Sequence, residues 1–153
     1  MRDLAAKSMM DVLAIADDFS GAAEIAGIGA RFGLPTRLLR RRPARAEPGL
    51  TVVDTDSRLL SPGEAVIRVR QLIKGLPLAA FGLVYKKTDS VLRRPVRAEI
   101  EAMMEVLDRR AALLVAANPS RGRTVRQGVY RIDGVPLDQT PFAHDPDHPA
   151  RSS

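Results

Sequence analysis

The chain has 153 residues, 45% of them hydrophobic and none of them Cys, so it can form one domain with an apolar core but no disulfide, cysteine-based zinc site or catalytic thiol. No apolar run approaches the ~20 residues of a membrane-spanning helix and no apolar signal-peptide core precedes Asp11, so we expect a cytoplasmic protein. The net charge of +6 comes largely from arginine, and either an anionic small molecule or a nucleic acid would suit it.

Short apolar runs alternate with helical patterns along the chain. The apolar runs predict buried strands at residues 10–16, 36–39, 50–53, 79–85 and 111–117. Apolar residues at helical spacing predict helices at residues 21–32, 62–73 and 96–107. Two short runs joined by Asp133-Gly134 predict a hairpin over residues 129–137. This order predicts an α/β fold: a three-layer, Rossmann-like, mostly parallel sheet with helices on both faces and a small C-terminal hairpin.

Four polar loops follow predicted strands. They are Asp17-Asp18 and residues 54–58, 86–94 and 118–123. In a parallel sheet the carboxyl ends of the strands share one edge, where α/β proteins bind ligands, so these loops can meet there. The third loop carries two lysines, an aspartate, a serine and two arginines just before a helix, a position that favours anions. The alternative interpretation of this loop is a solvated basic turn.

The side chains of these loops suit a ligand that carries both hydroxyls and a carboxylate. Carboxylates can accept hydrogen bonds from hydroxyls or take a proton from one, although Asp18 or Ser20 is also expected to cap the following helix. Arginine binds a carboxylate through a planar two-point fork. The candidate catalytic residues are therefore Asp17 and Asp18, and the candidate substrate-binding residues are Arg58, Lys86, Lys87, Asp89, Ser90 and Arg93. The two histidines, His144 and His148, are too isolated to predict a metal site.

Several motifs follow one another in the order of a known family. They are Ile15-Ala16-Asp17-Asp18-Phe19-Ser20-Gly21-Ala22, residues 54–58, residues 86–93, Gly122-Arg123-Thr124, Gly134-Val135-Pro136-Leu137 and Thr140. With these motifs the chain resembles the N-terminal part of the four-carbon acid sugar kinase family. The resemblance implies that this part binds a tetronate-type sugar acid, that a C-terminal domain binds the nucleotide, and that the full-length protein uses ATP and Mg²⁺.

The resemblance covers only the sugar-acid-binding half of that family. We therefore predict a sugar-acid-binding domain over residues 1–140 and a linker or tail over residues 141–153, toward a nucleotide-binding domain supplied in cis or in trans. No Walker-type phosphate loop is present, so this chain alone is expected to bind no cofactor and to be inactive as a kinase. A homo-oligomer is possible.

Two glycines of the family are replaced here by Arg94 and Arg97. The replacement can reshape the pocket, recruit a more anionic ligand or mark a protein that has lost activity. The alternative functions are a non-catalytic binding module for an anionic metabolite and, less favoured, a basic nucleic-acid binder. Aromatic residues that could stack on bases are nearly absent from the arginine-rich residues 37–45.

Overall fold

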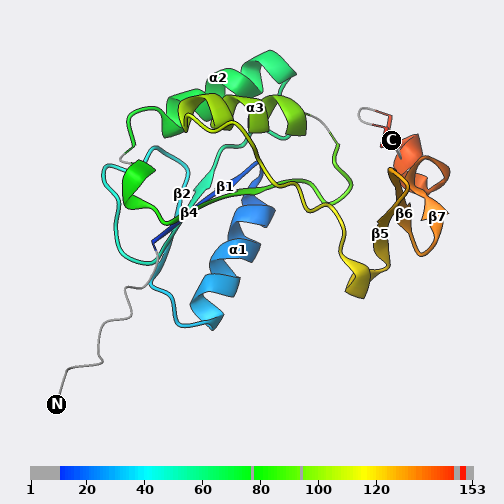
Figure 1. Cartoon of the computed structure of the whole chain (residues 1–153), viewed down its shortest axis with the longest axis horizontal. Coiled ribbons are helices and arrows are strands. Elements are labelled where there is room, and N and C mark those ends of the chain that lie inside the picture. Colours follow the sequence, from blue (N-terminus) through cyan, green and yellow to red (C-terminus); the bar gives the residue numbers. More distant parts are fainter. Residues whose placement is uncertain (1–10, 77, 94, 147–148, 151–153) are drawn as a thin grey trace.

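A four-stranded parallel sheet forms the centre of the fold. The computed structural model describes residues 11–76, 78–93, 95–146 and 149–150. The strands β1 Val12–Ala16, β2 Thr36–Leu39, β3 Leu50–Asp54 and β4 Leu83–Lys87 lie in the order β2-β3-β1-β4. Their pairings are parallel, which confirms the predicted α/β class, and the strands therefore end at one shared edge (Figure 1).

Three helices cover the two faces of this sheet. Helix α1, Phe19–Arg31, lies on one face, and α2, Pro62–Ile73, packs with α3, Val96–Val106, on the other (Figure 1). Alternate residues of β1 point to opposite faces: Leu13 and Ile15 pack with α2 and α3, whereas Ala14 and Ala16 pack with α1. None of the described helices is long and apolar enough to span a membrane.

Two of the helices begin at the capping residues that the sequence indicates. At the start of α1, Asp18 Oδ1 accepts a 2.8 Å hydrogen bond from the backbone amide of Gly21. At the start of α2, Ser61 and Glu64 form a reciprocal capping box, with Pro62 in the first turn. A side-chain cap of this kind stabilises a helix by about 1 kcal/mol. The first cap also fixes Asp18 at the carboxyl edge of the sheet.

Two predicted strands differ in the structure. The fourth begins at Leu83 rather than at residue 79, because Leu78–Ala80 forms a 3-10 turn. The fifth, at residues 111–117, does not form, and Leu113 and Val115 are 90% and 72% exposed. An apolar run does not specify a pairing partner. Here Ala116 O accepts a 3.4 Å hydrogen bond from the hydroxyl of Tyr130, which ties the end of the segment to the C-terminal sheet.

A small antiparallel sheet lies beyond the carboxyl end of β4 (Figure 1). It has the order β5 Arg123–Arg126, β6 Val129–Ile132 and β7 Val135–Pro136, which adds one strand to the predicted hairpin. Short 3-10 turns flank it at Pro119–Arg121, Leu137–Gln139 and Pro141–His144. An apolar cluster of Val91, Tyr130, Leu137 and Ala150 packs this unit against the loop after β4. The packing brings residues 118–123 to the carboxyl edge of the large sheet.

The predicted linker at residues 141–153 stays a prediction. Within it, Phe142 and Ala150 pack with the same apolar cluster as Tyr130. Residues 147–148 and 151–153, with His148 among them, lie outside the described residues.

Candidate functional site

A cleft of about 730 Å³ opens at the carboxyl edge of the parallel sheet. Its walls are the start of α1, the end of β4 with the following loop, and the turn at residues 118–123. The strand register explains the convergence, because Ala16 pairs with both Asp54 and Lys87, so the loops after β1, β3 and β4 leave the sheet at one level. Five of the predicted site residues line the cleft: Asp18, Arg58, Lys87, Asp89 and Ser90.

Arg58 holds the two candidate catalytic acids together. Its Nε and Nη2 lie 3.1 and 3.2 Å from the two carboxylate oxygens of Asp17, and its Nη1 lies 2.6 Å from Asp18 Oδ2. Burial by itself would lower the pKa of the Arg58 guanidinium, but the hydrogen bonds and charge of Asp17, with the charge of Asp18, raise it above its usual value. Both acids are therefore fixed by one cation, and Asp17 is buried behind the cleft wall.

Lys87 lies across the start of α1. Its ammonium is 3.6 Å from Glu24 Oε2 and donates a 3.1 Å hydrogen bond to the carbonyl of Thr88. A Cβ at Gly21 would lie 2.8 Å from Asp18 Oδ1 and 3.3 Å from Lys87 Cγ, so a side chain at this position would crowd both residues at the helix start. Lys87, Gly21 and Asp18 all line the cleft.

Lys86 does not enter the cleft. It points to the other face of the sheet, where its ammonium lies 3.1 Å from Glu99 Oε2 and both side chains are almost fully buried. Glu99 also accepts a hydrogen bond from Ser57 Oγ, which in turn contacts the hydroxyl of Thr55. This buried network joins the first turn of α3 to the loop after β3. Sequence reasoning missed its acid, Glu99, although strand alternation would have separated the two lysines.

Asp89 and Arg93 close the loop after β4 on itself. Arg93 Nε and Nη2 donate to the two carboxylate oxygens of Asp89 at 2.8 and 3.2 Å, and its backbone amide donates at 3.1 Å. Burial tends to raise the pKa of Asp89, but these hydrogen bonds outweigh it and hold the pKa below its usual value. Arg93 also donates to Asp145 at 3.1 Å and stacks over Phe142. It therefore shapes the cleft wall without lining it.

Of the two arginines expected to replace family glycines, only Arg97 lies within the described residues. Arg97 projects into solvent from α3, where its side chain is 90% exposed and pairs with Glu101 at 2.7 Å. It does not enter the cleft, so the predicted effect of this arginine on the pocket has no structural basis. Arg94 lies outside the described residues.

The turn at residues 118–123 supplies two lining cations, Arg121 and Arg123, that were not among the predicted site residues. The available signal was the position of the turn after an apolar run, together with the Gly122-Arg123-Thr124 motif. Its place in the cleft depends on the packing of the C-terminal sheet on the loop after β4, which no local pattern encodes.

A parallel sheet covered on both faces defines an α/β domain, and its cleft of acids and cations lies at the carboxyl edge, where α/β proteins commonly bind ligands. The chain belongs to the sugar-binding N-terminal domain family, whose model matches residues 12–153. This assignment confirms the resemblance seen in the sequence.

Curated relatives are sugar-acid kinases. The chain is 36% identical to the D-threonate kinase of Salmonella typhimurium over 94% of its own length, and 35% identical to the D-erythronate kinase of Heliobacterium modesticaldum over 95%. It covers 35% and 34% of those proteins, so it spans about a third of their length.

Solved structures of two relatives share the fold. A domain of unknown function from Bordetella bronchiseptica, described as a domain-swapped dimer with bound citrate, superposes with a TM-score of 0.78 at 34% identity, over 94% of this chain and 38% of that one. A structure from Salmonella typhimurium superposes with a TM-score of 0.80 at 27% identity, over 95% of this chain and 36% of that one.

Proposed function

We propose that this chain is the substrate-binding half of an ATP-dependent kinase that phosphorylates four-carbon sugar acids of the tetronate type. The observation that carries the proposal is the cleft at the carboxyl edge, where Asp18 and Asp89 stand beside the cations Arg58 and Lys87. Carboxylates suit the hydroxyls of a sugar acid, and cations suit its carboxylate. Kinases for D-threonate and D-erythronate are relatives at 36% and 35% identity, which supports this ligand class.

The proposed roles follow from what each side chain contacts. Asp18 faces the ligand and accepts a hydrogen bond or a proton from the reacting hydroxyl of the ligand. Asp17 contributes indirectly, because Arg58 contacts both acids. Lys87, Asp89 and Ser90 bind the remaining polar groups of the acid. Lys86 and Arg93 support the wall through Glu99 and Asp89 rather than by touching the ligand.

ATP and Mg²⁺ belong to the proposed kinase as a whole. The sequence has no glycine-rich phosphate loop with Lys and Ser or Thr. Among the described residues, no three His, Asp or Glu side chains gather where they could hold a metal ion. We therefore propose that a C-terminal domain, in cis or in trans, supplies the nucleotide site.

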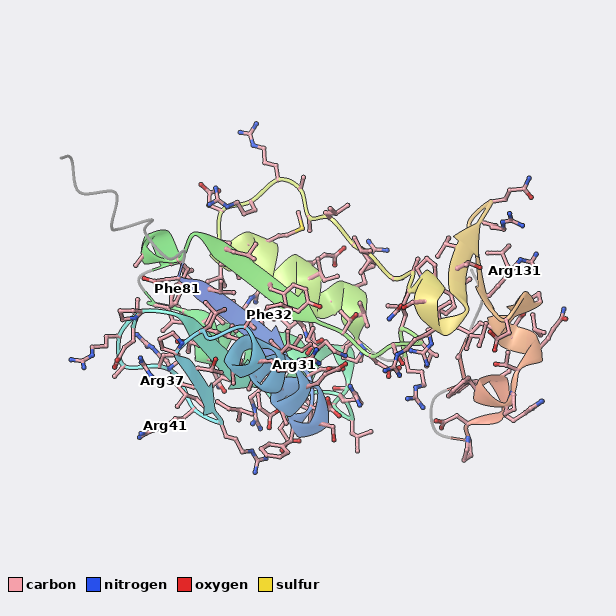
Figure 2. The ribbon with its side chains drawn as sticks, turned by 90° about the horizontal axis from the view of Figure 1, so that it is seen from below. Arg31, Phe32, Arg37, Arg41, Phe81 and Arg131 are labelled. Atoms are coloured by element: carbon pink, nitrogen blue, oxygen red, sulfur yellow. The ribbon has the colours of Figure 1, made fainter. Side chains whose placement is uncertain are left out.

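The rival function is a non-catalytic binding module for an anionic metabolite, and the same cleft would serve it. A nucleic-acid binder is less favoured, because the arginines do not all lie together: Figure 2 shows Arg37 and Arg41, from the arginine-rich stretch, at one end of the molecule and Arg131 at the other. Several arginines of residues 37–45 are also committed to acids, as in the pairs of Arg37 with Glu47 at 2.7 Å and of Arg40 with Asp56 at 2.9 Å.

We also propose that the chain self-associates. The apolar side chains of Leu113, Leu114 and Val115 are exposed, and β4 is an edge strand of the described sheet. A second copy of the chain would cover these apolar side chains and the open edge of β4. The Bordetella relative, which is described as a domain-swapped dimer, supports an exchange of this kind.

The test is ligand-induced stabilisation of the purified chain. D-threonate or D-erythronate should raise the melting temperature, and citrate, ADP and duplex DNA are run in parallel. Lys87→Met should remove most of the tetronate effect, whereas Lys74→Met, an exposed lysine at the end of α2, should not. Stabilisation by citrate alone would favour the metabolite module. Binding to duplex DNA with a steep salt dependence would favour the nucleic-acid function.

A further inference from the structure

The cations that line the cleft differ in whether an acidic side chain of the protein already pairs with them. Arg58 is bound by Asp17 and Asp18, and Lys87 is paired with Glu24. By contrast, no ion pair to Arg121 or Arg123 is formed within the described part of the chain. The uncompensated positive charge of the cleft therefore lies on one wall, the turn at residues 118–123.

This turn holds its two arginines on a fixed backbone. Asn118 and Arg123 exchange both backbone hydrogen bonds, at 2.8 and 3.0 Å, and the amide of Arg121 donates to Asn118 O at 3.0 Å. Gly122 sits between the arginines with φ of +67°, a conformation that favours glycine. A binding group on a preformed turn loses less conformational entropy when it captures a ligand.

A second contact fixes the turn relative to the opposite walls. Tyr130 of β6 pairs with Val125 of β5, the strand that follows the turn. Its hydroxyl donates a 2.7 Å hydrogen bond to Ser90 O in the loop after β4. Asp133 donates its backbone amide to Gly122 O at 2.9 Å. The arginine wall is thus anchored to the same loop that carries Asp89 and Ser90 into the cleft.

Three cations among the predicted substrate-binding residues have acidic partners. Arg58 contacts Asp17 and Asp18, Lys86 contacts Glu99, and Arg93 contacts Asp89. A ligand carboxylate would have to compete with those acids, which are fixed parts of the fold. Arg121 and Arg123 offer planar guanidinium groups that form no ion pair among the described residues, although the Asp133 carboxylate lies close to Gly122 between them.

We propose that Arg121 and Arg123 bind the carboxylate of the sugar acid, so that its hydroxyls face Asp18 and Lys87 on the opposite walls. This assignment rests on the proposed function of the cleft. It makes the turn at residues 118–123 the part that distinguishes a sugar acid from a neutral polyol of the same length, because a polyol presents the same hydroxyls but no charge to the arginines.

The experiment compares two ligands that differ only in the acid group, D-threonate and its neutral polyol D-threitol, by calorimetric titration of the full chain. The variants are Arg123→Gln and the double variant Arg121→Gln/Arg123→Gln. Arg126→Gln is the matched control, since Arg126 lies in the same strand but does not line the cleft. The melting temperature without ligand verifies that each variant folds, and Arg123→Lys tests partial rescue by charge alone.

Wild type should bind D-threonate more tightly than D-threitol, and the double variant should lose about tenfold to a hundredfold of its affinity for D-threonate. Its affinity for D-threitol and the affinities of Arg126→Gln should stay unchanged. Wild-type binding of D-threonate with no loss in the double variant would overturn the arginine assignment alone. Equal loss for both ligands would also overturn it, since that result indicates a general role in shaping the cleft. Absence of D-threonate binding to the wild type would overturn the proposed function and this assignment together.

Discussion

Lys86 and Lys87 are consecutive in β4, yet their ammonium groups lie on opposite faces of the parallel sheet. Lys86 Nζ lies 3.1 Å from Glu99 Oε2 on the side of α3, and Lys87 Nζ lies 3.6 Å from Glu24 Oε2 on the side of α1. Side chains alternate along a strand, so two adjacent lysines at the end of β4 must separate in this way. One of them is a buried structural group and the other faces the cleft.

This separation predicts that the same substitution affects stability very differently at the two positions. Lys86→Met should lower the free energy of unfolding by about 3–5 kcal/mol, because it leaves the buried Glu99 carboxylate without its cation. Lys87→Met should change stability little. Urea denaturation measures both, and the double variant Lys86→Met/Glu99→Leu should recover part of the loss. A cost below about 1 kcal/mol for Lys86→Met would contradict the buried pair.

Substitution by alanine should be favourable at one glycine of α1 and harmful at another. A Cβ added at Gly27 would meet no neighbouring atom within 4 Å, so Gly27→Ala should stabilise the helix by about 0.5–1 kcal/mol. At Gly21 the same methyl group would meet Asp18 Oδ1 at 2.8 Å, which should displace the capping acid and weaken tetronate binding. Thermal unfolding and calorimetric titration measure the two effects. Unchanged ligand affinity in Gly21→Ala would speak against Asp18 as a ligand contact.

The Asp89–Arg93 pair should make stability depend on pH in the acid range. The native pKa of Asp89 is lowered, so its ionised form stabilises the fold above the unfolded-chain pKa of ~3.9, and this contribution is lost as pH falls through the lowered native pKa. Asp89→Asn should therefore cost about 1.5–3 kcal/mol near neutral pH and progressively less in acid.

Denaturant unfolding between about pH 7 and pH 2.5 provides the measurement for this pair. Arg93→Gln should give the same shape of profile, because it removes the same hydrogen bonds from the other side. If the loss in Asp89→Asn were equal at both ends of the range, the pair would not be responsible for it.

Because the segment at residues 111–117 is exposed, we expect replacement of an apolar residue in it to have little effect on the stability of the monomer. Leu113→Ser should change the free energy of unfolding by less than about 0.5 kcal/mol, because Leu113 is 90% exposed. Leu13→Ala, at a fully buried position, should cost about 2–5 kcal/mol. If a second copy covers the segment, Leu113→Ser should also shift the protein toward monomer in sedimentation experiments. A core-sized loss of stability in Leu113→Ser would mean that the segment packs within its own chain.

The chain alone should not transfer phosphate from ATP at an enzymatic rate. Phosphoryl transfer requires the phosphates, a metal ion and the acceptor hydroxyl to be held in line, and the proposed role of the cleft is to hold the acceptor. ADP release should be undetectable with D-threonate and Mg²⁺, and it should appear when a nucleotide-binding domain of a relative is added. Acid-dependent turnover near ~1 s⁻¹ by the chain alone would contradict the half-enzyme proposal.

The amino-acid sequence determined the parts of this protein that depend on short-range patterns. Apolar periodicity and capping residues predicted the three helices, the α/β class and the parallel sheet, and the caps at Asp18 and Ser61 lie where their motifs indicated. The polar loops could be assigned to one edge because parallel strands share the direction of their carboxyl ends.

Only the tertiary structure decided which charges meet. Glu99 reaches Ser57 across 42 residues of sequence and Asp145 reaches Arg93 across 52, and neither partner is marked by a local pattern. Residues 111–117 likewise have the composition of a strand but no ladder partner. Hydrogen bonds and ion pairs depend on distances of a few ångströms, which only the packing of α3 and the C-terminal sheet sets. That packing removes Arg93 from the cleft lining and brings Arg121 and Arg123 into it.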